Sequence, residues 1–501
     1  MKSKSRYFRL SQLCEGIGTL DRSIMHDKDV IELHYDSRKA GSGSLFFAVK
    51  GLKDDGNKYI EDVIKKGAAG IVTDEREAYL RFSAGIDMVL VRDAEGIMTA
   101  VGDRFYDNVL ERMNLIGITG TNGKSSTAMF IHSIINNWNK GCGLLGTIYN
   151  DLGEGFIKAD MTTPLALDSL QSFSMMQEKG ISWAVMEVSS HSIHRKRVKN
   201  FPFLIGALTN ISQDHLDYHG NMDEYRKVKM SFFDHVQEGG YCIIPYTLAQ
   251  DSALKSLAGK KNLLTFNDPA GDYYIRQKKY SDRMVLLWIR TPDGEISVST
   301  GYLNDFMHEN ILLAIAVSKS IGITNSCIAK SIENFKGIPG RVEVVYDDDF
   351  KAVVDYAHTP DAILRVIKEF RMTHPGSRII TVFGAGGNKD KSKRPLMGKY
   401  ASMFSDVLIL TSDNPRDERP LDIISDIYRG IDKDCLKSLE VIIQDDRRKA
   451  IEIAVEYAGP GDIILLLGKG HEESLEEGGR FYHFSDREIL KESINARGKN
   501  A

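Results

Sequence analysis

One short stretch carries the residue types that bind phosphate groups. In "GITGTNGKSSTAMF", residues 117–130, three glycines precede a lysine and a serine: Gly117, Gly120, Gly123, Lys124 and Ser125. Glycines let the backbone approach an anion closely, the lysine reaches phosphate oxygens, and the serine hydroxyl is a magnesium ligand in nucleotide-binding loops. A strand-like run, "NLIGIT", precedes the loop, and the helix-like run after it would place a helix N-terminus at the phosphate. The stretch therefore predicts a nucleotide site, with a glycine-rich turn beside a surface lysine as the alternative.

The loop departs from the common phosphate-loop pattern at one position. That pattern requires a glycine, four residues and then Gly-Lys-Ser/Thr. Here Ile118 stands five residues before Gly123, and the glycine comes one residue earlier.

Acidic and histidine side chains follow two other apolar runs. Glu187 closes "WAVMEV", where a carboxylate would face the same crevice as the loop and fits a magnesium ligand; a solvated strand end is the alternative. The stretch "TNISQDHLDYHG" places four potential ligands close together: Asp214, His215, Asp217 and His219. No cysteine-rich segment accompanies them, so a zinc site is not indicated.

Lys229 interrupts an apolar stripe. A helix through "MDEYRKVKMSFFDH" would place it on one face with Tyr225, Phe232 and Phe233. A lysine there can extend its ammonium to solvent, or it can be buried with a depressed pKa and a neutral amine. A neutral amine can take up CO2 to form a carbamate, which is an anionic ligand for magnesium.

Parallel strands are needed to bring these residues together. Apolar strand-like runs alternate with amphipathic helix-like runs, as in α/β domains, and "RMVLLWIRTPDGEISVST" reads as a hairpin. A chain of this length predicts about three domains, which we place at residues 1–110, 111–341 and 342–501. In the third, three apolar runs lead directly into glycines and charged residues: "RIITVFGAGGNKDKSKRP", "DVLILTSDNPRDERP" and "DIILLLGKGHEE". Open α/β sheets bind ligands at such strand ends.

Composition argues against a nucleic-acid-binding or membrane protein. The chain carries 65 Lys and Arg against 69 Asp and Glu, a net charge of -4, which indicates neither nucleic acid nor an anionic membrane surface as a partner. Its 5 cysteines form no CxxC pair, which is typical of free thiols in a reducing compartment. No apolar run is long enough to cross a membrane. We expect a cytoplasmic protein without membrane insertion.

The chain resembles the Mur ligase family over nearly its whole length. The family's ATP loop reads G-x-x-G-T-N-G-K-[ST], which matches "GITGTNGKSS" and accounts for the displaced glycine. Further motifs occur in the family's order: "TTP", "MEVSSHS", "TNISQDHLDYHG", "VDYAHTPDA", "KRPLMG", "DNPR" and "GKGHE". The resemblance implies an α/β fold with three domains. The first binds a uridine nucleotide, the central one has a P-loop-type, mostly parallel sheet, and the C-terminal one is Rossmann-like and binds an amino acid.

The resemblance also implies a reaction in peptidoglycan precursor synthesis, and thus in cell wall biogenesis. With ATP and Mg²⁺, the terminal carboxylate of UDP-N-acetylmuramoyl-L-alanyl-D-glutamate (UDP-MurNAc-L-Ala-D-Glu) becomes an acyl phosphate, which an amino acid's amine then attacks. Catalytic roles fall on Lys124, Glu187, His215 and Lys229, the last as a carbamate. Ser125 and Glu187 would hold one magnesium ion, and His215 with modified Lys229 a second.

Binding residues follow from the matched motifs. ATP would contact Gly120, Thr121, Asn122, Gly123, Lys124, Ser125, Ser126, Asn310, Arg341, Asp355 and His358. The uridine substrate would contact Ser37, Thr162, Thr163, Ser189, Arg195 and Arg197. The incoming amino acid would contact Lys389, Asp413, Asn414, Pro415, Arg416, Gly468 and Glu472. We expect the enzyme to work as a monomer.

Three positions depart from the family pattern. Lys389 stands in "GNKDK" where relatives have an arginine that grips the amino acid's carboxylate, so a two-bond contact becomes a point charge. Met307 stands where an asparagine near the adenine is frequent. Arg195 replaces a frequent glutamine in the substrate segment.

The motif "DNPR" bears on which amino acid is added. meso-Diaminopimelate differs from lysine by a second carboxylate at the far end of its side chain, and the guanidinium of Arg416 can pair with that group. The resemblance therefore predicts meso-diaminopimelate, with L-lysine or L-ornithine as the alternative. A folylpolyglutamate synthetase would lack a domain like residues 1–110. From another class, a catalytically silent Mur-like scaffold stays open.

Overall fold

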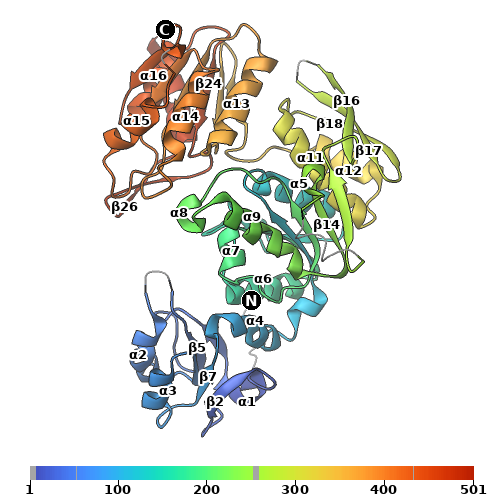
Figure 1. Cartoon of the computed structure of the whole chain (residues 1–501), viewed down its shortest axis with the longest axis vertical. Coiled ribbons are helices and arrows are strands. Elements are labelled where there is room, and N and C mark those ends of the chain that lie inside the picture. Colours follow the sequence, from blue (N-terminus) through green and yellow to red (C-terminus); the bar gives the residue numbers. More distant parts are fainter. Residues whose placement is uncertain (1–6, 52–53, 252–258, 282, 433, 501) are drawn as a thin grey trace.

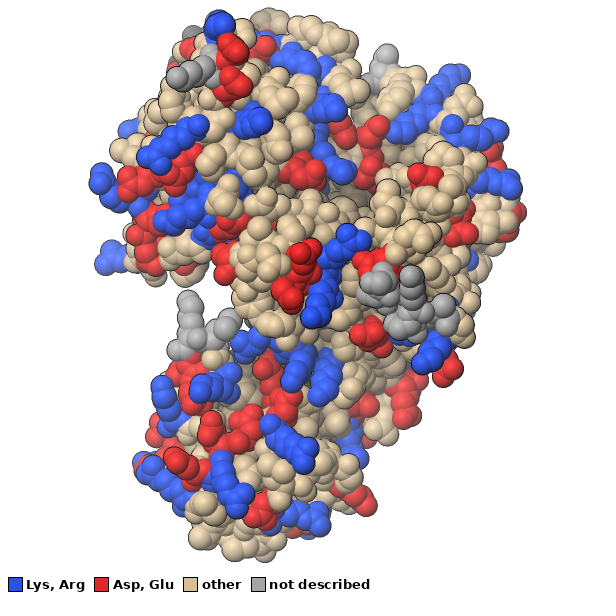
Figure 2. All heavy atoms as spheres, in the orientation of Figure 1, with Lys and Arg blue, Asp and Glu red and all other residues tan. Residues whose placement is uncertain are grey.

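The computed structural model describes residues 7–51, 54–251, 259–281, 283–432 and 434–500. Helices and strands alternate along the chain and form three successive α/β parts, with the N-terminal part at the bottom of Figure 1 and the C-terminal part at the top left. Figure 2 shows basic and acidic side chains interspersed over the face in view. None of the described helices combines the length and apolar character needed to cross a membrane.

The N-terminal part has a five-stranded sheet in the order β2-β7-β6-β5-β4, in which only β2 pairs antiparallel. Its strands are Thr19–Ser23, Met88–Val91, Gly70–Thr73, Ser44–Ala48 and Glu32–His34 in that order. Its helices are α1 Leu10–Leu13, α2 Ile60–Lys65, α3 Arg76–Phe82 and α4 Ala94–Phe105. A short ladder joins β1 Phe8–Arg9 to β3 Asp29–Val30.

The central part has an eight-stranded sheet in the order β11-β10-β9-β12-β8-β13-β14-β15. The strands are Phe156–Lys158, Tyr149–Asp151, Cys142–Leu145, Trp183–Glu187, Asn114–Thr119, Phe203–Leu208, Val236–Pro245 and Asn262–Phe266. From β9 to β15 they run parallel, so β8 and β12 end at one edge of the sheet. The helices are α5 Lys124–Asn137, α6 Ala166–Glu178, α7 Ser190–His194, α8 Leu216–His219, α9 Met222–Met230, α11 Asp305–Ser320 and α12 Asn325–Glu333.

An antiparallel sheet follows the central one. Its strands are β16 Tyr274–Tyr280, β17 Val285–Thr291 and β18 Gly294–Thr300. The pairing of Thr291 with Gly294 confirms the hairpin predicted from "RMVLLWIRTPDGEISVST".

The C-terminal part has a six-stranded sheet in the order β19-β20-β24-β21-β22-β23. The strands are Glu343–Asp347, Lys351–Asp355, Ile463–Leu467, Ile379–Phe383, Val407–Leu410 and Glu440–Ile443. All neighbours except β19 and β20 pair parallel. Its helices are α13 Pro360–Thr373, α14 Lys393–Ser402, α15 Pro420–Tyr428, α16 Arg447–Tyr457 and α17 Asp486–Asn500, and a hairpin joins β25 Ser474–Glu477 to β26 Arg480–His483.

Local sequence explains why these elements form where they do. Every residue of β6, β21 and β24 is buried, as expected for parallel strands covered on both faces. Helix α13 begins where Thr359 accepts a hydrogen bond from the Ala362 N–H and Pro360 occupies the first turn. The three large sheets confirm the predicted α/β class; the domain limits 1–110, 111–341 and 342–501 stay predictions.

Gly117 has a different role from the one its place in the loop motif suggested. It lies inside β8, and a Cβ atom there would collide with the rings of Phe232 and Phe203. Its small size therefore allows aromatic packing under the sheet, whereas Gly120 and Gly123 lie in the loop itself.

We predict that Gly117→Ala destabilises the central part by about 1–3 kcal/mol, because the added methyl group overpacks the core. Calorimetric unfolding would show a lower transition temperature. Gly85→Ala is the matched control, since its Cβ would meet no atom closer than the Phe82 oxygen at 3.8 Å. Equal transition temperatures for the two variants would contradict the packing role.

Candidate active site

The loop after β8 is braced by the end of β13. Gly120 and Gly123 have φ angles of 138° and 86°, in the region that favours glycine. A Cβ on Gly120 would collide with Thr209, and one on Gly123 with Asn310 of α11. The Thr121 N–H donates to the Asn210 carbonyl at 2.9 Å. The loop's shape is therefore fixed by neighbouring elements.

Lys124, at the start of α5, turns back over this loop. Its Nζ donates to the carbonyl oxygens of Gly120 at 3.0 Å and Thr121 at 2.9 Å. Burial lowers the pKa of Lys124, while nearby Glu187 opposes the shift. The ammonium thus lies where phosphate oxygens on the loop would enter.

Ser125 and Glu187 meet at the ends of adjacent strands. Glu187 pairs in register with Ile118 of β8 and is 2% exposed. The Ser125 hydroxyl donates to Glu187 Oε2 at 3.0 Å. Thr147 donates its N–H to Oε1 at 2.7 Å and its hydroxyl to Oε2 at 2.8 Å. The solvated strand end considered for Glu187 is wrong, since the carboxylate is buried and points at the loop.

Thr147 was missed from sequence. It follows the apolar strand β9, which pairs with β12, and a polar residue just beyond a buried strand was the available signal. Its hydroxyl oxygen also lies 3.1 Å from that of Thr162, which connects Glu187 with the predicted substrate segment.

Lys229 is buried, so the interpretation in which its ammonium reaches solvent is wrong. It is 1% exposed, and its Nζ donates to the same Gly120 oxygen that Lys124 contacts, at 2.7 Å. Its Nζ lies 4.7 Å from the centre of the Tyr225 ring, whose hydroxyl is 3.1 Å from Thr121 Oγ1. Burial holds the pKa of Lys229 well below its usual value, and Lys124 lowers it further. Burial and the nearby Lys124 charge thus both favour the neutral amine over the ammonium.

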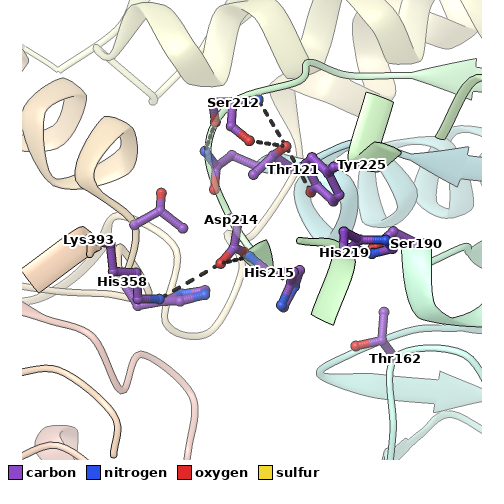
Figure 3. A network of polar contacts seen from close by, with 12 residues as sticks. Thr121, Thr162, Ser190, Ser212, Asp214, His215, His219, Tyr225, His358 and Lys393 are labelled. Carbon is purple, nitrogen blue, oxygen red and sulfur yellow. Dashed lines mark hydrogen bonds and ion pairs between the residues drawn. The ribbon is translucent and has the colours of Figure 1, made fainter. Parts of the chain in front are cut away.

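Asp214 points toward Lys393 and His358 of the C-terminal part, and His215 follows it in the chain (Figure 3). His215 adopts a φ of 54°, and its Nε2 lies 3.3 Å from Asp214 Oδ2. Burial lowers the pKa of His215 to about 3, and the imidazole is neutral, as a metal ligand requires. Burial alone would raise the pKa of Asp214, but His215, His358 and Lys393 hold it below its usual value.

Lys393 was not selected from sequence although it lies in the quoted motif "KRPLMG". Its Nζ is 3.8 Å from Asp214 Oδ1, and both side chains are buried. His358 lies beside the pair (Figure 3). This ion pair joins the central and C-terminal parts.

The two parts enclose a cavity of about 230 Å³. Most of the predicted ATP contacts line it: Thr121, Asn122, Gly123, Lys124, Ser125, Ser126, Asn310, Arg341, Asp355 and His358. Asp355 accepts from the Val342 and Ala357 N–H groups, both at 2.8 Å, and burial raises its pKa. Arg341 lies over the Tyr356 ring, 4.4 Å from its centre. Met307 also lines the cavity, beside Asn310.

The predicted contacts to the uridine substrate lie in two places, the central part near Glu187 and the N-terminal sheet. Thr163 and Ser189 adjoin Glu187, since Thr163 Oγ1 donates to the Glu187 carbonyl at 2.8 Å and accepts from the Ser189 N–H at 3.0 Å. Arg197 donates to the Thr163 carbonyl at 3.1 Å. Arg195 pairs with Glu95 of α4 at 3.6 Å, which links the central and N-terminal parts. Ser37 follows β4 in the N-terminal sheet, apart from the loop.

The predicted amino-acid residues lie on three loops that leave adjacent parallel strands β21, β22 and β24. Asn414 donates to Glu472 Oε2 at 2.9 Å, and buried Lys469, missed from sequence, donates to both residues. A Cβ on Gly468 would lie 2.6 Å from Asp413 Oδ2, so these loops are in close contact. Pro415 and Arg416 complete the second loop.

Lys389 is exposed on the first of these loops. Its charge affects the pKa of a histidine in the central part. The pKa of His191 falls to about 4, first through burial, then through His219 and Lys389. The charge of Lys389 therefore acts on His191 of the central part, while its contact with an amino acid stays a prediction.

Three models of one protein family match successive segments of the chain. Residues 30–101 match the model "Mur ligase family, catalytic domain", residues 118–318 "Mur ligase middle domain" and residues 340–470 "Mur ligase, glutamate ligase domain". A protein of Caldanaerobacter subterraneus subsp. tengcongensis, named UDP-N-acetylmuramoyl-L-alanyl-D-glutamate--2,6-diaminopimelate ligase, is 39% identical over 93% of this chain and 95% of its own length.

Solved structures have the same architecture. One with that same ligase name superposes with a TM-score of 0.67 at 28% identity, covering 98% of this chain and 99% of the other. The MurF ligase of Thermotoga maritima in complex with ADP gives 0.66 at 18% identity, covering 94% and 98%. The phosphate loop, the buried Glu187 and the matches along the chain lead to one conclusion: the protein belongs to the Mur ligase family.

Proposed function

We propose that this chain is an ATP-dependent ligase that joins meso-diaminopimelate to UDP-MurNAc-L-Ala-D-Glu. The names of its relatives support the reaction. The observation that carries it is the cavity in which Lys124 and Glu187 of the central part meet Arg341 and His358 of the C-terminal part. ATP and a uridine nucleotide as substrates fit a cytoplasmic enzyme, and we retain the monomer as part of the proposal.

The proposed reaction has two steps. A carboxylate oxygen of the dipeptide attacks the γ-phosphorus of ATP, ADP leaves, and an acyl phosphate forms. The amine then attacks the acyl carbon, phosphate leaves with the C–O electron pair, and the amine loses a proton to give the amide. Lys124 would pair with the phosphoryl oxygens, and Arg341, which also lines the cavity, would add positive charge.

The oxygen-rich side chains around Glu187 fit Mg²⁺, which is held by one or two carboxylates together with substrate phosphates. Ser125 and Glu187, in contact at 3.0 Å, would hold one ion. His215 and a carbamate on Lys229 would hold a second. Bound magnesium would offset the charge on the transferring phosphoryl group.

The carbamate proposal rests on the chemistry of the Lys229 pocket. Among the described residues no carboxylate pairs with its amine, which shares the Gly120 oxygen with Lys124. Two ammonium groups on one carbonyl would repel each other, so a neutral amine is favoured. Addition of CO2 to that amine releases one proton and leaves an anion beside Lys124.

The ion pair between Lys393 and Asp214 gives the two halves of the cavity a fixed contact. A weaker one connects Asn122 with Asp361 at 3.4 Å, and Arg365 pairs with Glu309 at 3.0 Å. Because ATP contacts are expected on both sides, we propose that Lys393 acts as a positioning residue that keeps the cavity closed.

The silent scaffold predicts a different outcome in a direct assay. A ligase releases phosphate only when ATP, the uridine dipeptide and an amino acid are all present. A scaffold would release none. The buried Ser125–Glu187 contact and the buried Lys229 amine favour the ligase.

Lys393→Met should weaken closure, because it removes the lysine that pairs with the buried Asp214 carboxylate across the junction, at a cost on the order of 3 kcal/mol. Hydrogen exchange in residues 210–219 should become faster, and the KM for ATP should rise. Lys391→Met is the control, since that side chain is 66% exposed and pairs with Glu418. Identical exchange in both variants would remove the closing role.

Lys229→Ala should fold and bind the uridine substrate but lose ligation by roughly 100-fold or more, because the anionic magnesium ligand is missing. Added formate or acetate should restore part of the rate. Lys227→Ala, on the same helix with a 77% exposed side chain, should keep full activity. A fully active Lys229→Ala protein would refute the carbamate role.

Wild-type protein should use meso-diaminopimelate with a kcat/KM at least about 100-fold above that for L-lysine, or roughly 2.7 kcal/mol. Arg416→Ala should abolish most of this preference and leave the KM for ATP little changed. Phosphate release and mass spectrometry of the product give the measurement. Equal efficiency with L-lysine or L-ornithine would disprove the choice of amino acid.

A further inference from the structure

Arg416 is held in place from two directions. Its φ of 53° is rare for a residue with a side chain, and such conformations persist only where the surroundings enforce them. Its Nη1 donates to the Gly387 carbonyl at 2.8 Å, on the loop that carries Lys389. The guanidinium therefore has a fixed position at the strand ends of the C-terminal sheet.

Glu476 lies against the other side of this guanidinium. Arg416 Nε is 2.9 Å from Glu476 Oε2. The backbone is joined as well, because the Arg416 N–H donates to the Glu476 carbonyl at 3.0 Å and the Gly478 N–H donates to the Arg416 carbonyl at 2.8 Å. The Glu476 N–H donates to Asn414 Oδ1 at 2.9 Å. Strand β25 thus fixes Glu476 beside the "DNPR" loop.

Both charged groups are partly exposed and can each form a further hydrogen bond with a ligand. The side chains of Arg416 and Glu476 are 24% and 28% exposed. Within the described residues, Nη2 of Arg416 and Oε1 of Glu476 have no hydrogen-bond partner. A lone arginine would accept any carboxylate, and a lone glutamate any ammonium. Side by side, the two groups complement a ligand end that carries a carboxylate and an ammonium together.

We propose that Glu476 is a specificity-determining residue that contacts the distal ammonium of the incoming amino acid while Arg416 contacts its distal carboxylate. The inference rests on the proposed ligase function and extends it to a residue outside the predicted site. It also changes the expectation for L-lysine, whose single distal ammonium meets an attractive carboxylate as well as the repulsive guanidinium. Glu476 therefore weakens the rejection of lysine that Arg416 alone would give.

Three amines separate these contributions: meso-diaminopimelate carries both distal groups, L-2-aminopimelate only the carboxylate, and L-lysine only the ammonium. Glu476→Gln should lower the ratio of kcat/KM for meso-diaminopimelate over L-2-aminopimelate by about tenfold or more, since one charge contact is lost. It should also lower kcat/KM for L-lysine. Glu476→Asp should keep most of the ratio.

Glu477→Gln is the matched control, because the next residue of a strand points to the opposite face. Its ratios should equal those of the wild type. If Glu476 has only a structural role, Glu476→Gln should lower kcat/KM for meso-diaminopimelate and for L-2-aminopimelate by the same factor. The ratio of the two values would then equal that of the wild type, which would overturn this inference but leave the proposed ligase function standing. A wild-type protein that ligates none of the amines overturns the proposed function and the inference with it.

Discussion

The carbonyl oxygen of Gly120 is the acceptor for two lysines, and much of the site depends on that contact. Lys124 reaches it from the start of α5 and Lys229 from α9, so the phosphate loop is attached to two helices at once. Gly120 must lack a side chain because Thr209 fills the space beside it. This backbone oxygen thereby helps to hold the loop in place. It also keeps the side-chain nitrogens of two lysines next to the loop, where anions would bind.

Charge balance explains the arrangement around this contact. Buried lysines without a nearby anion are costly, and here Glu187 at the end of β12 and Asp214 in the loop after β13 supply negative charge from the two sides of β8. Asp214 is in turn shared with Lys393 from the C-terminal part. The polar groups therefore form one connected set across the junction between two sheets.

Sequence patterns predicted the α/β class, the hairpin of β17 and β18, and the strand ends that carry Glu187 and the C-terminal loops. They succeed there because buried parallel strands are apolar throughout and because charged residues follow them directly. Burial of Lys229 could not be decided from sequence, since periodicity gives a face but not what packs on it. Thr147, Lys393 and Lys469 were missed because their roles arise from partners far away in the chain. Gly117 was misassigned because its need for space comes from Phe232 in a distant segment.

The parallel register of β21, β22 and β24 has a consequence for how such enzymes diversify. Their loops converge at one edge of the C-terminal sheet, whereas the phosphate loop leaves a different sheet. Mutations in these loops can alter which amino acid fits without changing the phosphate loop of the central sheet. The amino acid that is added can therefore change through single substitutions in the C-terminal loops while the phosphate loop keeps its sequence.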